Sequence, residues 1–205
     1  MKILIACEFS GIVREAFRLR GHDAWSCDLL PSEILGQHIQ DDVLKHLNDG
    51  WDMIIAFPPC TYLTSAGLCH NIKSEERSIK TVEAAQFVKT IMNCAVHKIA
   101  IENPSGYLNT HWQKPSQIIN PYQFGDEYLK RTCLWLKNIP KLVFYSYDDE
   151  FGKNHIVKPK YYYISSGSNY RRGATLNTSK AKRNSSDRSR TFQGIANAMS
   201  EQWNF

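Results

Sequence analysis

A cysteine that follows two prolines is the first residue of this sequence whose type and position could support covalent chemistry. Cys60 comes directly after Pro58-Pro59, which end the apolar run 51–57. Because two prolines restrict the backbone, they fix the direction of the side chain that follows. A thiol is intrinsically nucleophilic, and a single cysteine is otherwise most often a buried packing residue. The position of Cys60 directly after a strand and a rigid turn favours a nucleophile.

A carboxyl group stands at the end of a second apolar run. Glu102 follows the run 98–101 and is itself followed by Asn103 and Pro104. A carboxyl group that is partly removed from water has a raised pKa and can serve as a proton donor or a hydrogen-bond anchor. A surface acid before a turn proline is the ordinary alternative, and Glu102 alone does not exclude it.

A third group of residues could bind a nucleoside. Phe9-Ser10-Gly11 form a short turn after the apolar run 2–7, and Gly11 allows the backbone to approach a ligand. Asp28 stands 17 residues after Gly11 and could accept hydrogen bonds from ribose hydroxyls. The turn lacks the GxGxxG pattern that a dinucleotide pyrophosphate needs, so a ribose-containing cofactor without phosphate, such as S-adenosylmethionine, fits better. A plain strand-to-helix turn is the alternative.

Hydrophobic periodicity predicts the elements that must position these residues. Apolar runs of strand length alternate with stretches of helical spacing. The predicted helix 74–96 presents a broad apolar face made of Ile79, Val82, Ala85, Phe87, Val88, Ile91 and Ala95. The segment 143–147 is compatible with one more strand. The predicted strands are 2–7, 23–28, 51–57, 98–101 and 132–136, and the other predicted helices are 12–20 and 191–203.

Short buried strands that alternate with helices indicate an α/β fold with an open, largely parallel Rossmann-like sheet and helices on both faces. Ligands bind to such sheets at the carboxyl ends of the strands. The unusual residues of this sequence gather at those ends, after four of the predicted strands. We therefore expect one crevice that brings together the residues at 8–11, 28, 58–60 and 102–104.

The charge pattern divides the chain into three parts. Residues 1–150 form the predicted catalytic core, 151–190 a basic, tyrosine-rich segment, and 191–205 a helix that returns to the core. The net charge is +5 overall, but residues 153–190 carry +9 and the remainder carries −4. Such asymmetry favours a polyanionic partner, and nucleic acid is the obvious candidate. A solvated, partly flexible segment is the alternative.

Composition excludes several other classes of protein. The hydrophobic fraction of 42% is that of a globular chain, and no run approaches the roughly 20 apolar residues of a membrane span. No long apolar segment of a signal peptide follows Met1, so we expect a cytoplasmic protein without membrane contact. The six cysteines form no CxxC pair, so we expect reduced thiols and no metal site.

Together these residues resemble the cytosine C5-methyltransferases, and most of all the short chains of that family found in phages and prophages. Order and spacing agree over residues 1 to about 140, and the last motif matches separately. The Pro-Cys of 58–63 resembles the family's nucleophile motif, Glu102-Asn103 its Glu-Asn-Val motif, 7–11 its cofactor turn, Asp28-Leu29 and Asp42-Val43 its ribose and adenine contacts, and 192–199 its last motif.

The resemblance implies a mechanism and a set of roles. Cys60 would add to C6 of a pyrimidine, Glu102 would hold or protonate N3, and C5 would then accept a methyl group from S-adenosylmethionine. Arg131 would place a cation near the ring O2 and the thiolate. If the substrate is duplex DNA, the target base must be flipped out of the stack. The implied cofactor residues are Phe9, Ser10, Gly11, Asp28, Leu29, Asp42, Pro58 and Pro59, and the implied substrate residues are Asn103, Pro104, Arg171 and Arg172.

Departures from the family leave other functions open. Val13, Arg14 and Thr61 replace two glycines and a glutamine of the family's motifs, and the large target-recognition region is missing. Besides DNA, the substrate could therefore be a free pyrimidine nucleotide, or the chain could be an inactive relic that binds DNA. A nicotinamide dehydrogenase is disfavoured by the single glycine of the turn. The sequence gives no oligomeric state.

Overall fold

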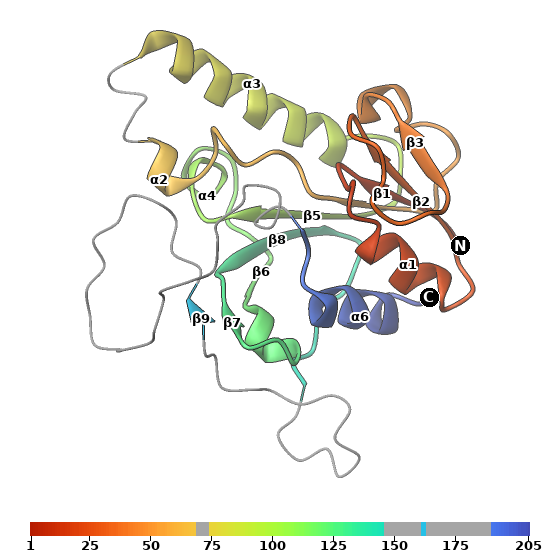
Figure 1. Cartoon of the computed structure of the whole chain (residues 1–205). Helices are drawn as coiled ribbons and strands as arrows, with labels where there is room; N and C mark the ends of the chain where they lie inside the picture. Colours follow the sequence, from red (N-terminus) through yellow and green to blue (C-terminus); the bar gives the residue numbers. More distant parts are fainter. Residues whose placement is uncertain (69–73, 146–160, 163–189) are drawn as a thin grey trace.

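The centre of the molecule is an open β-sheet covered by helices on both faces (Figure 1). The computed structural model describes residues 1–68, 74–145, 161–162 and 190–205. Within these residues, seven strands form one sheet in the order β3-β2-β1-β4-β5-β8-β6. They are β1 (Lys2–Ala6), β2 (Asp23–Asp28), β3 (His38–Gln40), β4 (Met53–Ala56), β5 (Lys98–Pro104), β6 (Gln117–Ile119) and β8 (Thr132–Lys137).

β8 is antiparallel to both of its neighbours, β5 and β6, whereas the pairs from β3 to β5 are parallel. The central strands β1 and β4 are buried almost throughout. Strands covered on both faces need continuous apolar runs, and the sequence supplies such runs at these positions. The predicted α/β class and its five strands are confirmed; the short strands β3 and β6 were not anticipated.

Helices α1 (Ile12–Arg18) and α6 (Gln193–Gln202) lie side by side on one face of the sheet, and α3 (Glu75–Met92) covers the other face (Figure 1). Ile195, Met199 and Trp203 of the C-terminal segment join Phe17 of α1 in one hydrophobic cluster. The C-terminal helix therefore packs against the core of the molecule.

The apolar face predicted for α3 is wrong in part. Ile79 and Val82 are 53% and 58% exposed. Positions 79 and 81 differ by about 200° around a helix axis, so they cannot face the same sheet. The sheet selects the other side of the helix, and its buried residues are Thr81, Ala85, Val88, Ile91 and Met92.

Residues 143–145 do not form the strand that the sequence suggested. Instead, the Val143 amide donates to Oε1 of Gln202 at 2.6 Å, and the Tyr145 hydroxyl donates to Glu201 at 3.1 Å. These side chains of α6 replace the partner strand that a β-segment needs, and Val143 is 72% exposed. Residues 146–147 and the predicted segment 151–190, apart from 161–162 and 190, lie outside the described residues.

Smaller elements complete the described part of the chain, and none of its helices is long and apolar enough to cross a membrane. The two-residue strands β7 and β9 pair in parallel, apart from the main sheet. The small elements are the 3-10 helices η1 (Val43–Lys45) and η3 (Pro121–Phe124), the helices α2 (Ser65–Leu68) and α4 (Tyr107–His111), and the strands β7 (Tyr128–Leu129) and β9 (Tyr161–Tyr162).

Candidate active site

The turn between β1 and α1 is organised by a buried glutamate. Oε1 of Glu8 accepts hydrogen bonds from the Val13 amide at 2.7 Å and from the Ser10 hydroxyl at 3.2 Å. The carboxylate thereby occupies the N-terminus of α1, where the helix dipole favours negative charge. Gly11 has φ +75°, and a Cβ there would lie 2.8 Å from the Arg14 guanidinium. The turn therefore requires glycine at position 11.

Protonation of Glu8 should make stability depend on pH. Burial raises its pKa from 4.5 to about 6, against the lowering effect of the Val13 and Arg14 amides. The folded state then holds more protons than the unfolded state between these pH values, so stability falls as pH rises from 4.5 to 6. The shift corresponds to about 2 kcal/mol.

We expect Glu8→Gln to remove this part of the pH dependence. Urea unfolding of the variant and the unsubstituted chain, measured from pH 4 to 7.5, gives the difference in unfolding free energy directly. That difference should change by about 2 kcal/mol across the interval. A difference that is constant with pH would contradict the assignment.

Arg14, which departs from the glycine of the family motif, fixes the loop that follows β2. Its side chain is fully buried. Nη1 donates to the hydroxyls of Ser26 and Ser32 at 2.9 and 3.0 Å, and Nη2 donates to the Ile34 carbonyl at 2.7 Å. A buried guanidinium is tolerated when its donors are paired in this way. The buried Arg14 side chain therefore positions residues 29–37.

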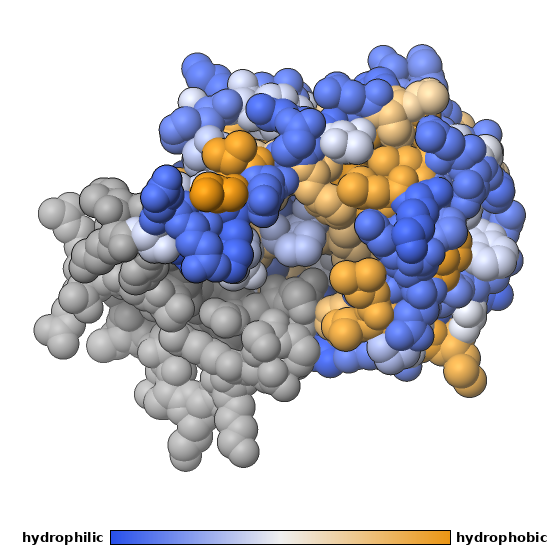
Figure 2. All heavy atoms as spheres, turned by 90° about the horizontal axis from the view of Figure 1, so that it is seen from above, coloured by the Kyte–Doolittle hydropathy of each residue, from blue (hydrophilic) through white to orange (hydrophobic). Residues whose placement is uncertain are grey.

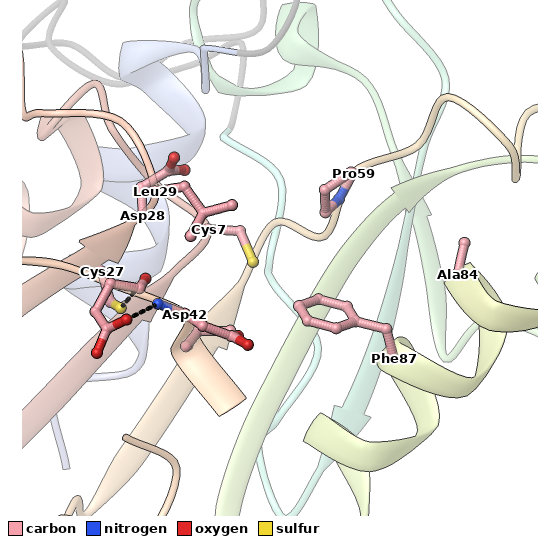
Figure 3. Close-up of a pocket in the computed structure, with 10 residues that line it drawn as sticks. Cys7, Cys27, Asp28, Leu29, Asp42, Pro59, Ala84 and Phe87 are labelled. Carbon is pink, nitrogen blue, oxygen red and sulfur yellow. Dashed lines mark hydrogen bonds between the residues drawn. The ribbon is translucent and has the colours of Figure 1, made fainter. Parts of the chain in front are cut away.

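An open cavity of about 220 Å³ lies at the carboxyl ends of β1, β2 and β4 (Figure 3). The Cys7 thiol and the Phe87 ring face one another across it, and Pro59 forms part of the wall above Phe87. Seen from the side of α3, hydrophobic surface gathers in the middle of this face among hydrophilic residues (Figure 2). The cavity is lined by Cys7, Cys27, Asp28, Leu29, Asp41, Asp42, Val43, Pro59, Ala84 and Phe87.

The electrostatics of this cavity are acidic. Three of its lining residues are aspartates, and no lysine or arginine is among them. Hydrogen bonds from Lys45, the Asp42 amide and His46 lower the pKa of Asp41 to about 2, so this carboxylate is ionised at neutral pH. Burial raises the pKa of Cys27 to about 11 and that of Cys7 further, so both thiols stay protonated and act as apolar wall. Such a cavity attracts a cation and repels phosphate.

Four of the predicted cofactor residues line this cavity, namely Asp28, Leu29, Asp42 and Pro59. The other four, Phe9, Ser10, Gly11 and Pro58, lie in the adjoining turns and do not line it. Sequence reasoning assigned no cofactor role to Ala84 and Phe87 of α3. Phe87 belongs to the apolar face predicted for this helix, but helical spacing did not show that the residue lines a cavity.

Cys60 stands at the edge of the same cavity. It is exposed, and it follows directly after the lining residue Pro59. The Cys60 carbonyl accepts hydrogen bonds from the amides of Leu63 and Thr64 at 2.9 and 3.1 Å, so the chain forms a tight turn immediately after the thiol. The same short segment therefore supplies a wall of the acidic cavity and an accessible thiol.

The neighbouring strand β5 holds the Cys60 turn in place. Asn103 is fully buried, and its Nδ2 donates to the Pro58 carbonyl at 2.9 Å. Further along, the Tyr107 amide donates to the Leu63 carbonyl at 2.8 Å. A Cβ at Gly106 would lie 1.9 Å from that carbonyl oxygen, so glycine is needed for this close approach. Asn103, for which a substrate contact is predicted, positions the turn through its hydrogen bond to the Pro58 carbonyl.

Glu102 lies at the end of β5 beside a second, small cavity, which is lined by Phe57, Glu102, Lys130, Thr132, Arg190, Thr191, Phe192 and Ile195. Burial raises the pKa of Glu102, whereas the Lys130 charge and a hydrogen bond with the Thr132 side chain lower it, and burial dominates. A carboxyl group in this environment stays protonated to a higher pH than usual and can donate a proton.

The charge that acts on Glu102 comes from Lys130, whereas Arg131 is the residue predicted to place a cation near the ring O2 and the thiolate. Arg131 is exposed and does not line the Glu102 cavity, whereas Lys130 and Thr132 do. Side chains alternate along an extended chain, so residues 130 and 132 share one side and residue 131 faces the other. Pro104, the other predicted substrate residue of this strand, is the last residue of β5. The predicted substrate residues Arg171 and Arg172 lie outside the described residues.

Comparisons with known proteins find a likeness among solved structures. No protein-family model and no curated protein matches the chain. Among solved structures, the chain is similar to the crystal structure of the S. pombe Dnmt2 methyltransferase, with 16% sequence identity and a TM-score of 0.43. The similarity covers 72% of this chain and 51% of that one, so the chain spans about half the length of that structure.

Proposed function

We propose that the chain transfers a methyl group from S-adenosylmethionine to C5 of cytosine in DNA, with Cys60 as a covalent nucleophile. One observation carries the proposal: the turn 58–60 provides both a wall of the acidic cavity, through Pro59, and the exposed thiol beside it. A cofactor in this cavity would therefore lie next to a substrate bound at Cys60. The motifs that resemble the cytosine C5-methyltransferases lie in this same region.

The donor set of the cavity fits S-adenosylmethionine better than a dinucleotide. Asp28 and Asp42 offer carboxylates to ribose hydroxyls and to an adenine amino group, and Pro59 and Phe87 offer apolar surface to the rings. Asp41 is paired with Lys45, but Asp28 and Asp42 also line the cavity, and their carboxylates suit the sulfonium cation of this cofactor better than a pyrophosphate. When bound, S-adenosylmethionine supplies an electrophilic methyl group.

The chain's own residues account for the activation of the pyrimidine. The Cys60 thiolate adds to C6, and Glu102 donates a proton to N3, so that the electron pair displaced from the ring collects at C5. Covalent addition of this kind divides one difficult step into easier ones. Once C5 carries its new substituent, loss of the C5 proton and of the Cys60 thiolate, with return of the N3 proton to Glu102, restores the aromatic ring. Lys130 and Thr132 hold the Glu102 carboxyl group during these steps.

Transfer of labelled methyl groups to DNA, measured side by side with transfer to deoxycytidine nucleotides, tests the proposed function. We expect label in DNA, and 5-methylcytosine after digestion of the product. Label found only in mononucleotides would replace the DNA substrate with a free pyrimidine nucleotide. Cofactor binding without any transfer would favour the inactive relic, and the absence of cofactor binding would refute the assignment of the cavity.

Replacement of Asp28 should weaken cofactor binding selectively. Asp28→Ala removes a carboxylate that would accept hydrogen bonds from ribose, and hydrogen bonds to charged groups contribute about 1.5–3 kcal/mol each. We therefore expect the Kd for S-adenosylmethionine, measured by calorimetry, to rise about 10- to 100-fold. Asp52→Ala, at the opposite edge of the sheet before β4, is the matched control and should leave Kd unchanged. Equal effects of the two substitutions would contradict the assignment.

A further inference from the structure

Arg77 of α3 directs its guanidinium group at the loop that follows Cys60. Nη2 donates to the Thr61 carbonyl at 3.2 Å, and Nε donates to the Gly67 carbonyl at 3.3 Å. The guanidinium also lies over the Tyr62 ring, 5.0 Å from its centroid. One side chain thus contacts the beginning, the aromatic side chain and the far end of the segment 61–67.

The position of Arg77 is itself fixed. Ser74 caps α3, and its Oγ accepts a hydrogen bond from the Arg77 amide at 3.2 Å. One turn later, the Thr81 hydroxyl lies 3.1 Å from the Tyr62 carbonyl, to which it can donate. The first part of α3 therefore forms one edge against which the loop is held.

The same helix continues to the cofactor cavity. Ala84 and Phe87 line that cavity, seven and ten positions after Arg77. A helix is rigid over this distance, so the contacts of Arg77 and the cavity wall keep a fixed position relative to each other. Because Thr61 is bonded directly to Cys60, a fixed Thr61 carbonyl also limits where the thiol can lie.

We propose that Arg77 is a positioning residue, which holds the Cys60 turn at a fixed place relative to the cofactor cavity. This role rests on the proposed function, and it extends the site to a residue that touches neither cofactor nor pyrimidine. Arginine suits the role because its planar group offers several donors in fixed directions and stacks on an aromatic ring. Lysine offers a point charge and cannot reproduce both the two carbonyl contacts and the stacking.

Kinetics of Arg77→Gln and Arg77→Lys test this role. We expect kcat to fall about 100-fold in Arg77→Gln, the effect typical of small misplacements of reacting groups. The Kd for S-adenosylmethionine should stay within about twofold, since the cavity wall is intact. Arg77→Lys should recover little of the rate. The control is Arg18→Gln, which removes a surface ion pair with Glu15 and should leave both kcat and Kd unchanged.

One measurement on the free protein separates this role from the proposed function. Hydrogen exchange at the Leu63 and Thr64 amides, which bond to the Cys60 carbonyl, should be faster in both Arg77 variants.

Unchanged exchange, or a full recovery of rate in Arg77→Lys, would overturn the positioning role. A loss of cofactor affinity equal to the loss of rate would do the same, since it would assign Arg77 to the cavity wall. If the unsubstituted chain transfers no methyl group, the proposed function fails, and the exchange measurement still decides whether Arg77 holds the turn. If Arg77→Gln does not fold, the same measurements are made on Arg77→Lys, which keeps the charge and most of the volume.

Discussion

Cys60→Ala should abolish methyl transfer, with a loss of about 10⁴-fold or more, the scale seen when a covalent nucleophile is removed. The variant should still bind S-adenosylmethionine, because the cavity is lined by the side chain of Pro59 and not by that of Cys60. Cys60 is exposed, so its removal leaves no hole in the core and should cost little stability.

A trapped adduct identifies the bond that Cys60 forms. DNA that contains 5-fluorocytosine cannot lose a proton from C5, so the covalent intermediate should persist and appear by mass spectrometry at the peptide that contains Cys60. The matched control is Cys94→Ala, in the connection between α3 and β5 at the other edge of the sheet. It should retain activity and adduct formation. A normal rate in Cys60→Ala would remove the covalent mechanism.

Glu102→Gln should produce the second largest effect. Glutamine fills the same space and can still form hydrogen bonds, but it cannot release a proton to N3. Loss of a general acid typically costs 10²- to 10⁴-fold, and we expect about that decrease in kcat. Glu76→Gln, in which an exposed carboxylate paired with Lys80 is lost, should have no effect.

The pH profile should distinguish proton donation from a simple hydrogen bond. Burial raises the pKa of Glu102, so its protonated form persists above the usual range for glutamate. The rate limited by this acid should therefore fall as pH rises through the raised pKa. Formation of the Cys60 thiolate acts in the opposite direction, so the unsubstituted chain should show a bell-shaped profile. Glu102→Gln should lose the alkaline limb, and a variant that retains it would contradict the role of Glu102 as the acid.

The sequence sufficed for the strands that are buried on both faces. Such strands appear in the sequence as apolar runs, as at 2–6 and 53–56, because side chains on both faces of the sheet must be buried. The edge strands β3 and β6 lack this signal. Each has only three residues, at least one of them polar, and each is partly exposed. Residues 143–145 carry an apolar pattern but pair with α6, which no local pattern records.

For the site, the ends of strands were predictable and the contacts between distant segments were not. Asp28 was predicted from the end of a strand, Asp42 and Pro59 from the resemblance to the methyltransferase motifs, and all three line the cavity. Phe87 was interpreted as core, since a phenylalanine on an amphipathic helix has that role more often. The place of Lys130 beside Glu102 was not predicted, because residues 130 and 131 precede β8 and the sequence does not show which of them faces the Glu102 cavity.

The place of β8 between β5 and β6 has a consequence for how the chain folds as it is synthesised. Until residues 132–137 leave the ribosome, the hydrogen-bonding edge of β5 has no neighbour, and an uncovered edge invites pairing with other chains. The apolar face of α1 stays uncovered longer still, since its partners Ile195, Met199 and Trp203 come much later in the sequence. Native contacts therefore join residues that are far apart in the sequence. We expect slow folding, with nascent intermediates that are prone to aggregate.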